Sequence, residues 1–423
     1  MAPIDTGAVP SGAHHLDPDG AQFFEIVQTY LPKEDRARVR RAFEVARQQH
    51  GDQRRRSGEP FFSHPLTVAY YLAEFRLDAD ALMAALLHDV AEDTRLSVRE
   101  IREEFGPEVS RLVDGVTKLK EVTAGVARGR ELSGKEIQDA SLHKMFDAMT
   151  TDVRVVLIKL FDRLHNMRTI KALPLHKQRS KAEETLTVYA PLANRLGIWR
   201  IKSELEALSL EVLDPEAYQA VKNSLDQQFL KQQAAYALIS EQIFACLQEK
   251  NLTVVNVVAS PENIYSVYRS LQARGASFDN FDSPLRVVVL LEDEAACYQA
   301  LGYVHQMWRP VPGQFDDYIA SPRENLYRAL HTTVIHRSGQ PLKVRFRSVD
   351  MNETSEIGVL ARWVYAGTPM WTRGIAERVE ALFDNISESI NLEPRDYSTA
   401  VKHVVEDVFR QQVMVYTPRG DVI

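Results

Sequence analysis

The chain has 423 residues, 45% of them hydrophobic and 26% charged, with a formal net charge of −7 at pH 7. This length suits two or three domains, and the composition is that of an ordinary globular protein. The negative net charge argues against direct DNA binding by the chain as a whole, so an anionic ligand would need a local basic patch.

The two cysteines, Cys246 and Cys297, stand far apart without a CxxC spacing, which argues against a disulfide framework and a structural zinc site. No apolar run reaches the ~20 residues needed to span a bilayer, and the N-terminus lacks the pattern of a signal peptide. We therefore expect a cytoplasmic protein with no membrane partner. Residues 1–20, rich in Pro, Gly and Asp, are predicted to be a disordered leader.

Helical periodicity runs through residues 21–200, which are predicted to form an all-α domain. Pro65 is expected in the first turn of one helix. Asp78 or Asp80 is expected to cap the next helix, which we predict to continue through Asp93 because the segment is rich in strong helix formers.

Breaks and a change of pattern follow along the chain. Gly106-Pro107 is predicted to separate two helices, and the Gly-rich, charged stretch 121–136 is predicted to be a mobile loop. Residues 203–250 are predicted to form one long helix.

Residues 201–370 are predicted to form a second, α+β domain with a small mixed sheet. Helical segments alternate there with β-rich runs, at 253–260, 285–292, 330–336 and 342–348. Residues 371–410 are read as a helical connector. Residues 411–423, "QVMVYTPRGDVI" with its preceding residue, resemble a strand that enters a tight turn, so we expect the start of a further domain cut from a longer protein.

The segment "LLHDVAED" places His88 and Asp89 one helical turn ahead of Glu92 and Asp93. Four ionisable side chains at the end of an apolar helix are either a solvated terminus or one reactive centre. Acidic side chains at a helix C-terminus oppose the helix dipole, which weakens the first interpretation. Mixed imidazole and carboxylate ligands suit Mn²⁺, Fe²⁺ or Zn²⁺ better than Mg²⁺ or Ca²⁺.

Further ligands would have to come from other segments. Asp162 lies in "FDRLHNM" with Asn166 one turn later, and His64 stands at a predicted helix entrance. His165 is expected to be a neutral surface histidine. Positive charge for an anionic substrate could come from "RRR" at 54–56 with Lys144, Arg163 and Arg168, although the arginine run is equally typical of a solvated loop.

The segments "QRRRSGEPFFSHPLTVA", "ALLHDVAEDT", "LVDGVTKL", "VVLIKLFDRLHNMRT" and "YAPLANRLGIWRIKSELE" closely resemble the catalytic half of long RelA/SpoT homologues. Those bacterial enzymes make and destroy the alarmone (p)ppGpp. The resemblance extends to "VMVYTPRGDVI", which is similar to the start of the family's TGS domain. It implies an all-α HD-type hydrolase domain, followed by a mixed-sheet, nucleotidyltransferase-like synthetase domain.

The resemblance also implies roles for particular residues in the first domain. One Mn²⁺ would be held by the family's metal ligands, which fall on His64, His88, Asp89 and Asp162. Glu92 and Asp93 would activate or orient the attacking water. The family's nucleotide-contacting positions fall on Arg55, Arg56, Ser57, Asn166 and Arg168, and we add Lys144 as a candidate substrate contact.

The second domain departs from the synthetase pattern at three places. "FDNFDSPLR" is shorter than the family's segment around its first carboxylate, so Asp282 would be displaced beside Arg286. The family's strand resembling "VEVQIRT" reads "LKVRFRS" here, which puts Lys343 in place of the acid and Arg345 in place of the glutamine. "ENLYRALH" keeps Tyr327 and His331 but has Leu326 where the family has a glycine, which should crowd a ligand.

These observations predict a metal-dependent (p)ppGpp 3′-pyrophosphohydrolase whose synthetase domain is inactive and serves as a scaffold or regulator. Three alternatives stay open: a bifunctional synthetase and hydrolase, an HD phosphohydrolase acting on another nucleotide, and a non-catalytic signalling protein. The expected substrates are ppGpp and pppGpp. A regulatory nucleotide or protein partner is expected to act through the C-terminal region that the family carries beyond this chain.

Overall fold

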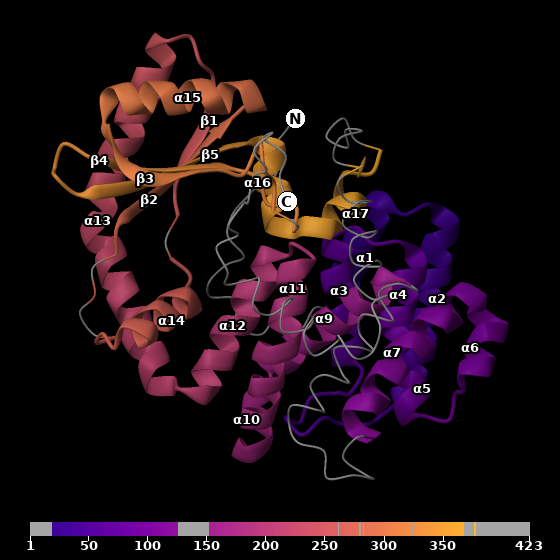
Figure 1. Cartoon of the computed structure of the whole chain (residues 1–423). Helices are drawn as coiled ribbons and strands as arrows, with labels where there is room; N and C mark the ends of the chain where they lie inside the picture. Colours follow the sequence, from indigo (N-terminus) through magenta and orange to yellow (C-terminus); the bar gives the residue numbers. More distant parts are fainter. Residues whose placement is uncertain are drawn as a thin grey trace, which may run out of the picture. The chain divides into compact units, whose positions relative to one another are not determined.

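The structure is a computed structural model that describes residues 19–125, 152–260, 262–278, 281, 283–323, 325–367 and 376–377. Contacts divide the described residues into two compact units, shown in Figure 1. The helical unit covers residues 19–125 and 152–178, and the sheet unit covers the described residues from 179 onward. None of the described helices is long and apolar enough to cross a membrane.

The helical unit is built from α-helices with one short 3₁₀ helix. Its elements are α1 (Gly20–Tyr30), α2 (Lys33–His50), α3 (Ser63–Glu74), α4 (Ala79–Leu87), α5 (Val90–Asp93), α6 (Val98–Phe105), α7 (Pro107–Gly125), α9 (Val153–Arg168) and η2 (Ile170–Ala172). Helix α10 (Leu175–Glu184) crosses the division between the two units.

Side-chain caps set several of these helix starts, as the sequence predicts. Asp78 accepts a hydrogen bond from the Ala81 amide at 3.0 Å, which confirms one of the two expected caps of α4. Ser97 and Glu100 form a capping box at the start of α6. Gly106, with φ of +96°, ends α6, so the predicted break before Pro107 is confirmed.

Two expectations for this unit are wrong. The helix predicted to continue through Asp93 is interrupted at His88 and Asp89, so that α4 and the short α5 are separate elements. The loop predicted from residue 121 begins later, because α7 continues to Gly125. The rest of that predicted loop and residues 1–18 of the predicted leader lie outside the described residues.

Helix α9 runs through the centre of the helical unit and packs against α3, α4 and α7. It buries Leu157, Leu160 and Phe161 almost completely. Gly115 on α7 allows the close approach of α9, because a Cβ atom there would lie 2.9 Å from Cγ2 of Val155. The position of α9 is therefore set by dense apolar packing on several sides.

The sheet unit begins with helices and continues into an α/β layer. Its elements are η3 (Thr185–Tyr189, a π-helix), α11 (Ala190–Arg195), α12 (Trp199–Leu213), α13 (Pro215–Glu249), β1 (Val254–Ala259), α14 (Ile264–Arg274), β2 (Leu285–Leu291), α15 (Glu294–Met307), β3 (Arg309–Asp317), β4 (Leu330–Ile335), β5 (Pro341–Ser348), α16 (Val349–Ile357), η4 (Gly358–Leu360) and α17 (Ala361–Tyr365).

The five strands lie in the order β1-β2-β5-β4-β3, with β2 and β5 parallel and the other neighbours antiparallel. Helices α13 and α15 cover one face of this sheet, and their apolar side chains share a core with alternate residues of the central strands (Figure 1). The expected mixed sheet and the four predicted strands are confirmed, with small shifts at their ends.

Two features of the sheet unit differ from expectation. Strand β3 was not predicted, since its sequence "RPVPGQFDD" contains two prolines and one glycine. Proline is tolerated at the edge of a sheet, where its missing N–H costs no ladder bond, and β3 is one of the two edge strands among the described residues. The predicted long helix 203–250 is two helices, because Pro215 starts α13 and Asp214 caps it. The predicted segments 371–410 and 411–423 lie almost wholly outside the described residues.

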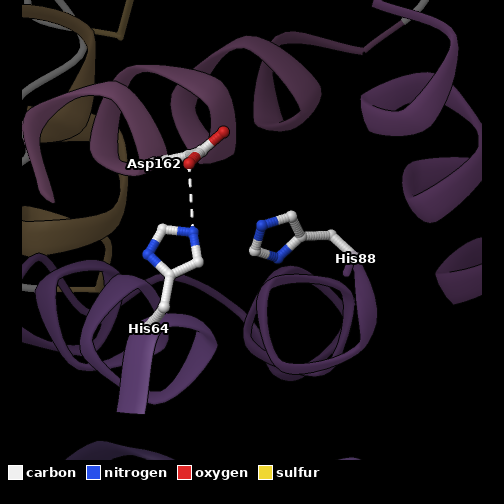
Figure 2. A group of neighbouring side chains, drawn as sticks. All are labelled: His64, His88 and Asp162. Carbon is white, nitrogen blue, oxygen red and sulfur yellow. Dashed lines mark ion pairs between the residues drawn. The ribbon is translucent and has the colours of Figure 1, made fainter. Parts of the chain in front are cut away.

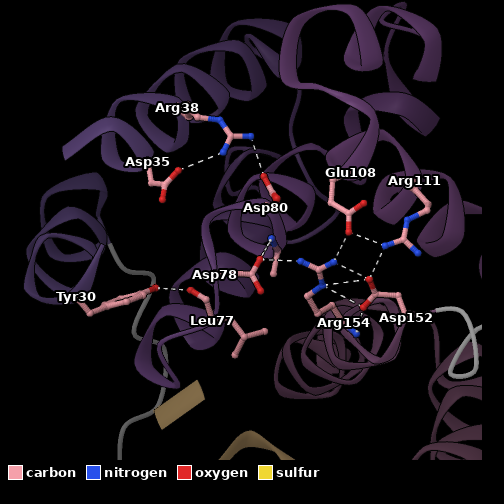
Figure 3. A network of polar contacts seen from close by, with 11 residues as sticks. Tyr30, Asp35, Arg38, Leu77, Asp78, Asp80, Glu108, Arg111, Asp152 and Arg154 are labelled. Carbon is pink, nitrogen blue, oxygen red and sulfur yellow. Dashed lines mark hydrogen bonds and ion pairs between the residues drawn. The ribbon is translucent and has the colours of Figure 1, made fainter. Parts of the chain in front are cut away.

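A network of charged side chains joins the starts of α4, α7 and α9, as Figure 3 shows. Arg154 is its centre: its Nη2 lies 2.6 Å from Glu108 Oε1 and 2.7 Å from Asp152 Oδ2, and its Nη1 lies 3.0 Å from Asp78 Oδ1. The Arg154 and Asp152 side chains are only 16% and 11% exposed, so the charges are largely removed from water. The network therefore holds the N-terminal end of α9 in place.

Replacing Arg154 with methionine (Arg154→Met) should destabilise the protein by about 3 kcal/mol, because Asp152 and Glu108 would keep only Arg111 and Asp78 would lose its pairing with Arg154. Arg38→Met is the matched control, since Arg38 pairs with Asp35 and Asp80 at a site where its side chain is 45% exposed. That loss should be about 1 kcal/mol or less. Chemical unfolding of both variants tests this, and equal losses would contradict a buried role for Arg154.

The same network predicts a pH dependence. Burial by itself would raise the pKa of Asp152, but hydrogen bonds and charge from Arg154 lower it, and the hydrogen bond from Arg111 lowers the pKa of Glu108. A carboxylate with a lowered pKa contributes stability above its unfolded pKa of about 4 and loses it as the pH falls further. Wild type should have a higher Tm than Arg154→Met at pH 7, and this difference in Tm should become smaller as the pH is lowered to 3. A difference that stayed constant over this range would argue against the ionic contribution.

Candidate metal centre and comparison with known proteins

Three segments of the helical unit bring ionisable side chains to one place. His64 is the second residue of α3, His88 and Asp89 occupy the break between α4 and α5, and Asp162 is on α9. Figure 2 shows His64, His88 and Asp162 pointing towards one another. His88 is completely buried, and His64 and Asp89 are 4% and 5% exposed. The alternative of a solvated helix end, which the sequence already disfavoured, is therefore wrong for His88 and Asp89.

The nitrogens and oxygens of this group lie within direct reach of one another. His64 Nε2 lies 3.1 Å from Asp162 Oδ1 and 3.5 Å from Asp89 Oδ2. His88 Nε2 lies 3.4 Å from Asp89 Oδ1. Asp89 thus stands between the two imidazoles, and the same nitrogen of each ring, Nε2, faces a carboxylate.

The hydrogen bond made by the other nitrogen of His88 determines its tautomer. His88 Nδ1 lies 2.7 Å from the carbonyl oxygen of Ala85, which can only accept a hydrogen bond, so Nδ1 carries the proton. In the neutral ring Nε2 then has a lone pair. This atom is buried and has no hydrogen-bond partner among the described residues. A buried ring nitrogen that faces a carboxylate oxygen needs a proton or a metal ion between the two atoms.

His64 is oriented in the same way through His165. The two Nδ1 atoms are 2.7 Å apart, so one ring donates to the other. Arg55 Nη1, which can only donate, lies 3.4 Å from His165 Nδ1 and favours that atom as the acceptor. His64 Nδ1 then carries the shared proton, and its Nε2 has a lone pair facing Asp162. Burial and the neighbouring His64 and Arg55 lower the pKa of His165 to about 2, which keeps its ring neutral.

Asp162 is held as a carboxylate by its neighbours. Burial by itself would raise its pKa, but the positive charge of Lys159 lowers it well below its usual value. Lys159 Nζ donates to Oδ2 at 3.1 Å, whereas Oδ1 accepts from Asn166 Nδ2 at 2.6 Å. One oxygen is therefore neutralised by a lysine, and the other faces the imidazole of His64.

The donor set fits a divalent metal ion. His64, His88 and Asp162 each offer one ligand atom within 4.8 Å of the others. Imidazole nitrogens whose second nitrogen is hydrogen-bonded are the usual ligands of a transition metal. A second group, Asp89, Glu92 and Asp93, meets the same distance criterion, and Asp89 connects the two groups. Glu92 is half-buried and Asp93 is exposed, so the second group opens towards solvent.

The expected substrate-binding residues differ in how closely they are connected to the proposed metal ligands. Arg55 Nη2 donates to Asn166 Oδ1 at 3.1 Å, which links both residues to Asp162 through the Asn166 amide. Arg56 and Ser57 are exposed in a tight turn closed by the Gly58 amide and the Arg55 carbonyl at 2.9 Å.

The remaining predicted contacts are less directly connected to the cluster. Arg168 donates to the Tyr71 hydroxyl at 2.6 Å, and its guanidinium lies 4.9 Å from the centre of that ring. Arg163, expected as local positive charge, is buried at 7% exposure. Lys144 lies outside the described residues.

Sequence analysis missed two residues of this centre, Lys159 and His165. His165 was expected at the surface, but it is 3% exposed and holds His64, so that expectation is wrong. Lys159 is 5% exposed. The spacing in the sequence could have indicated both residues. Lys159 lies three residues before Asp162 and His165 lies three residues after it, which puts all three side chains near one face of α9.

The residues singled out in the second domain lie on the sheet face opposite α13 and α15. Arg286 is the register partner of Lys343, and Arg345 is the register partner of His331. The Tyr327 hydroxyl lies 2.5 Å from His331 Nε2. The structure thus brings five of the six residues to one surface of the sheet unit. Asp282, the sixth, lies outside the described residues.

The chain matches two protein-family models. One describes the HD domain and matches residues 42–199, and the other describes a region found in RelA and SpoT proteins and matches residues 261–369. The first match contains every proposed metal ligand, and the second contains the whole sheet from β2 to β5.

Curated relatives agree with these matches. A probable GTP pyrophosphokinase of Mycobacterium leprae is 39% identical over 406 residues, which cover 94% of this chain and 50% of the relative. A GTP pyrophosphokinase of Myxococcus xanthus is 37% identical over 406 residues, covering 94% of this chain and 51% of the relative. The chain thus spans about half the length of these curated relatives.

Among solved structures, a metazoan orthologue of SpoT that hydrolyses ppGpp is 23% identical. The alignment covers 42% of this chain and 96% of that one, with a TM-score of 0.30, which is too low to support an inference. The two family models and the curated relatives, by contrast, point to the same group of proteins. The chain belongs to the RelA/SpoT homologues, with a helical HD domain followed by a mixed-sheet, synthetase-like domain.

Proposed function

We propose that this protein is a cytoplasmic, Mn²⁺-dependent hydrolase that removes the 3′-diphosphate of ppGpp and pppGpp as pyrophosphate, releasing GDP and GTP. The observation that carries this proposal is the pair of imidazole lone pairs, on His64 and His88, aimed at the Asp162 and Asp89 carboxylates. We propose these four residues as the ligands of one metal ion. Mixed nitrogen and oxygen donors suit Mn²⁺, although the same donors also suit Fe²⁺ and Zn²⁺.

Hydrolysis of the 3′-diphosphate adds water to the first phosphorus and breaks its bond to the 3′ oxygen, which leaves with a proton as a hydroxyl. A bound divalent ion supplies Lewis acidity, which lowers the pKa of a coordinated water and offsets charge on phosphate oxygens. Glu92 and Asp93 stand beside Asp89, with one ligand atom of each residue within 4.8 Å of the others; Glu92 is half-buried and Asp93 is exposed to solvent. We assign them to accept a proton from water and to orient it.

The substrate carries several negative charges, and the site must balance them. Arg55 is placed for this task, because Asn166 connects it to Asp162 and its guanidinium is only partly buried. Arg56 and Ser57 occupy the adjacent exposed turn, and Arg168 and Lys144 complete the proposed set. Guanidinium groups bind phosphate through paired hydrogen bonds, so arginine suits this role better than lysine.

The second domain is proposed to have no synthetase activity. Transfer of pyrophosphate from ATP requires Mg²⁺ held by carboxylates. Lys343 and Arg345 put cations on β5 at the positions where the resemblance implies an acid and an amide, and their register neighbours Arg286 and His331 supply no acid either. We propose that this domain acts as a scaffold or regulator of the hydrolase.

A bifunctional enzyme is the second candidate, favoured by the curated relatives that carry the name GTP pyrophosphokinase. A third candidate is hydrolysis of a different nucleotide by the same HD centre. Side-by-side turnover of ppGpp, GTP and dGTP distinguishes this last candidate, because only an enzyme specific for the 3′-diphosphate should leave the two triphosphates intact.

The first functional prediction separates metal binding from proton transfer. His88→Ala and Asp162→Asn should weaken Mn²⁺ binding by about 100-fold or more, because each removes a ligand rather than an outer contact. Glu92→Gln should keep Mn²⁺ affinity and lower kcat for ppGpp by about 10²–10⁴-fold. Mn²⁺ titration of the full chain, with ppGpp turnover in Mn²⁺ and in EDTA, provides the measurements.

Glu44→Gln is the matched control for Glu92→Gln, since Glu44 is an exposed glutamate on α2 of the same unit. It should leave both metal binding and turnover unchanged. Turnover that persists in EDTA, or that survives Asp162→Asn, would refute a metal-dependent HD hydrolase.

The second functional prediction concerns synthesis. With ATP, GDP and Mg²⁺, the Asp162→Asn chain should form no ppGpp, because the sheet unit lacks the carboxylates needed on β5. Using a variant without hydrolase activity prevents loss of any product that is made. Detectable ppGpp in this assay would establish the bifunctional alternative.

A further inference from the structure

One exposed glutamine of the helical unit, Gln53, contacts two separate parts of the proposed hydrolase site. Its backbone closes the base of a short hairpin over residues 53–61, where the Gln53 carbonyl accepts from the Phe61 amide at 2.8 Å. Its side-chain Nε2 donates to the backbone carbonyl of Asp93, the last residue of α5, at 3.4 Å. The hairpin that follows α2 is thereby joined to a helix 40 residues later in the chain.

The hairpin carries three of the residues proposed to bind phosphate, and α5 carries the two residues proposed to handle water. An isolated antiparallel bridge between Arg54 and Pro60 holds the hairpin closed, and the Arg54 guanidinium donates to the Gly58 carbonyl at 2.8 Å. Helix α5 is a single turn of four residues, and the last carbonyls of a helix have no partner within the helix. Gln53 supplies a donor to one of these carbonyls.

The two contacts of the Gln53 side chain fix the orientation of its amide. The carbonyl oxygen of Asp93 can only accept a hydrogen bond, so the amide nitrogen faces it. The amide oxygen then faces His50 Nδ1 at 3.0 Å, and because this oxygen can only accept, Nδ1 carries the proton. His50 therefore orients the amide that donates to Asp93.

Packing alone does not explain a histidine at position 50. His50 is 1% exposed, and its ring stacks on that of Phe61, with centroids 4.8 Å apart and planes inclined by 28°. Its Nε2 is buried and has no hydrogen-bond partner among the described residues. Burying an unsatisfied ring nitrogen is unfavourable, and phenylalanine would keep the stacking without that cost. The hydrogen bond to Gln53 is the contact that requires a polar ring.

We propose that Gln53, oriented by His50, is a positioning residue that holds Glu92 and Asp93 in place relative to the phosphate-binding hairpin. A phosphate bound by the hairpin and a water beside α5 take part in one step, so an error of about 1 Å in their separation is costly. Gln53 joins the two elements and is itself neither a proposed metal ligand nor a proton acceptor. This inference rests on the proposed hydrolysis, but the contact can also be measured without turnover.

Gln53→Met removes both hydrogen bonds of the side chain and keeps its length and neutral charge. We expect kcat for ppGpp to fall about tenfold, whereas KM and Mn²⁺ affinity change by less than about twofold, because the hairpin backbone and the metal ligands are untouched. Gln48→Met is the matched control, since Gln48 is exposed on α2, and it should change none of these values. An unchanged kcat in Gln53→Met, or a loss of Mn²⁺ affinity, would overturn the proposal.

Two variants of His50 separate its hydrogen bond from its stacking. In His50→Phe the ring still packs on Phe61 but cannot donate, so kcat should fall about tenfold while the Tm stays equal or rises. In His50→Asn the side-chain amide can donate in place of Nδ1, so kcat should fall clearly less than in His50→Phe. Full activity of His50→Phe would show that only the stacking matters and would refute the role assigned to Gln53.

The double variant tests whether the two residues act through one contact. His50→Phe combined with Gln53→Met should be no slower than Gln53→Met alone, because His50 acts by orienting Gln53. If the two losses in kcat multiply, the residues have independent roles, which contradicts the proposal.

Hydrogen exchange measures the contact without turnover. The Thr94 amide donates to the Val90 carbonyl at 3.1 Å, so its exchange rate reports whether the end of α5 opens. In Gln53→Met and His50→Phe it should exchange about fivefold faster, while the amides of α6 stay unchanged. Equal exchange in wild type and both variants would overturn the positioning role. A wild type that leaves ppGpp intact would instead refute the proposed function, and faster exchange in the variants would still support the contact.

Discussion

The Asp162 carboxylate, only 14% exposed, is enclosed by His64, Lys159 and Asn166, and the arrangement of the helical unit follows from the need to compensate its charge. A buried carboxylate is costly unless it is paired and hydrogen-bonded. Lys159 supplies the charge from the same helix, and Asn166 supplies a hydrogen bond from one turn later. The third partner, His64, comes from α3, so α3 and α9 must pack directly against each other.

The same requirement explains why the centre suits a metal ion. His64 and His88 each commit Nδ1 to a hydrogen bond, with His165 and with the Ala85 carbonyl, and each turns Nε2 towards a carboxylate. Each Nε2 and the carboxylate oxygen that it faces are 3.1–3.5 Å apart and need a proton or a metal ion between them. The Arg154 network fixes the start of α9, and the packing of Gly115 against Val155 brings α7 close to it. The ligand geometry therefore rests on interactions well outside the centre itself.

The two units differ in their electrostatics. In the helical unit, carboxylate oxygens and imidazole nitrogens form a donor set that fits a divalent cation. In the sheet unit, Lys343 and Arg345 supply positive charge directly, and Arg286 stands beside them in register. A site of the first kind can activate water. The side chains described beside Lys343 and Arg345 on β2 and β4 include a further cation, Arg286, and no carboxylate, so this face favours anions over metal ions.

Much of the local structure was predictable, because its causes are local. The cap at Asp78, the break at Gly106 and four of the five strands follow from residue types and spacing. Strand β3 was missed because its prolines are compatible with a strand only at a sheet edge, and the sequence does not say which strand is at the edge. His165 was misplaced for a related reason: its burial depends on α3, whose His64 is 101 residues away. By itself, the sequence determined the chemical types of the ligands, the helical periods that present them and the cations on β5. Only the tertiary structure decided which nitrogen of each histidine is available and which carboxylate it faces, since both depend on hydrogen bonds between segments far apart in the chain.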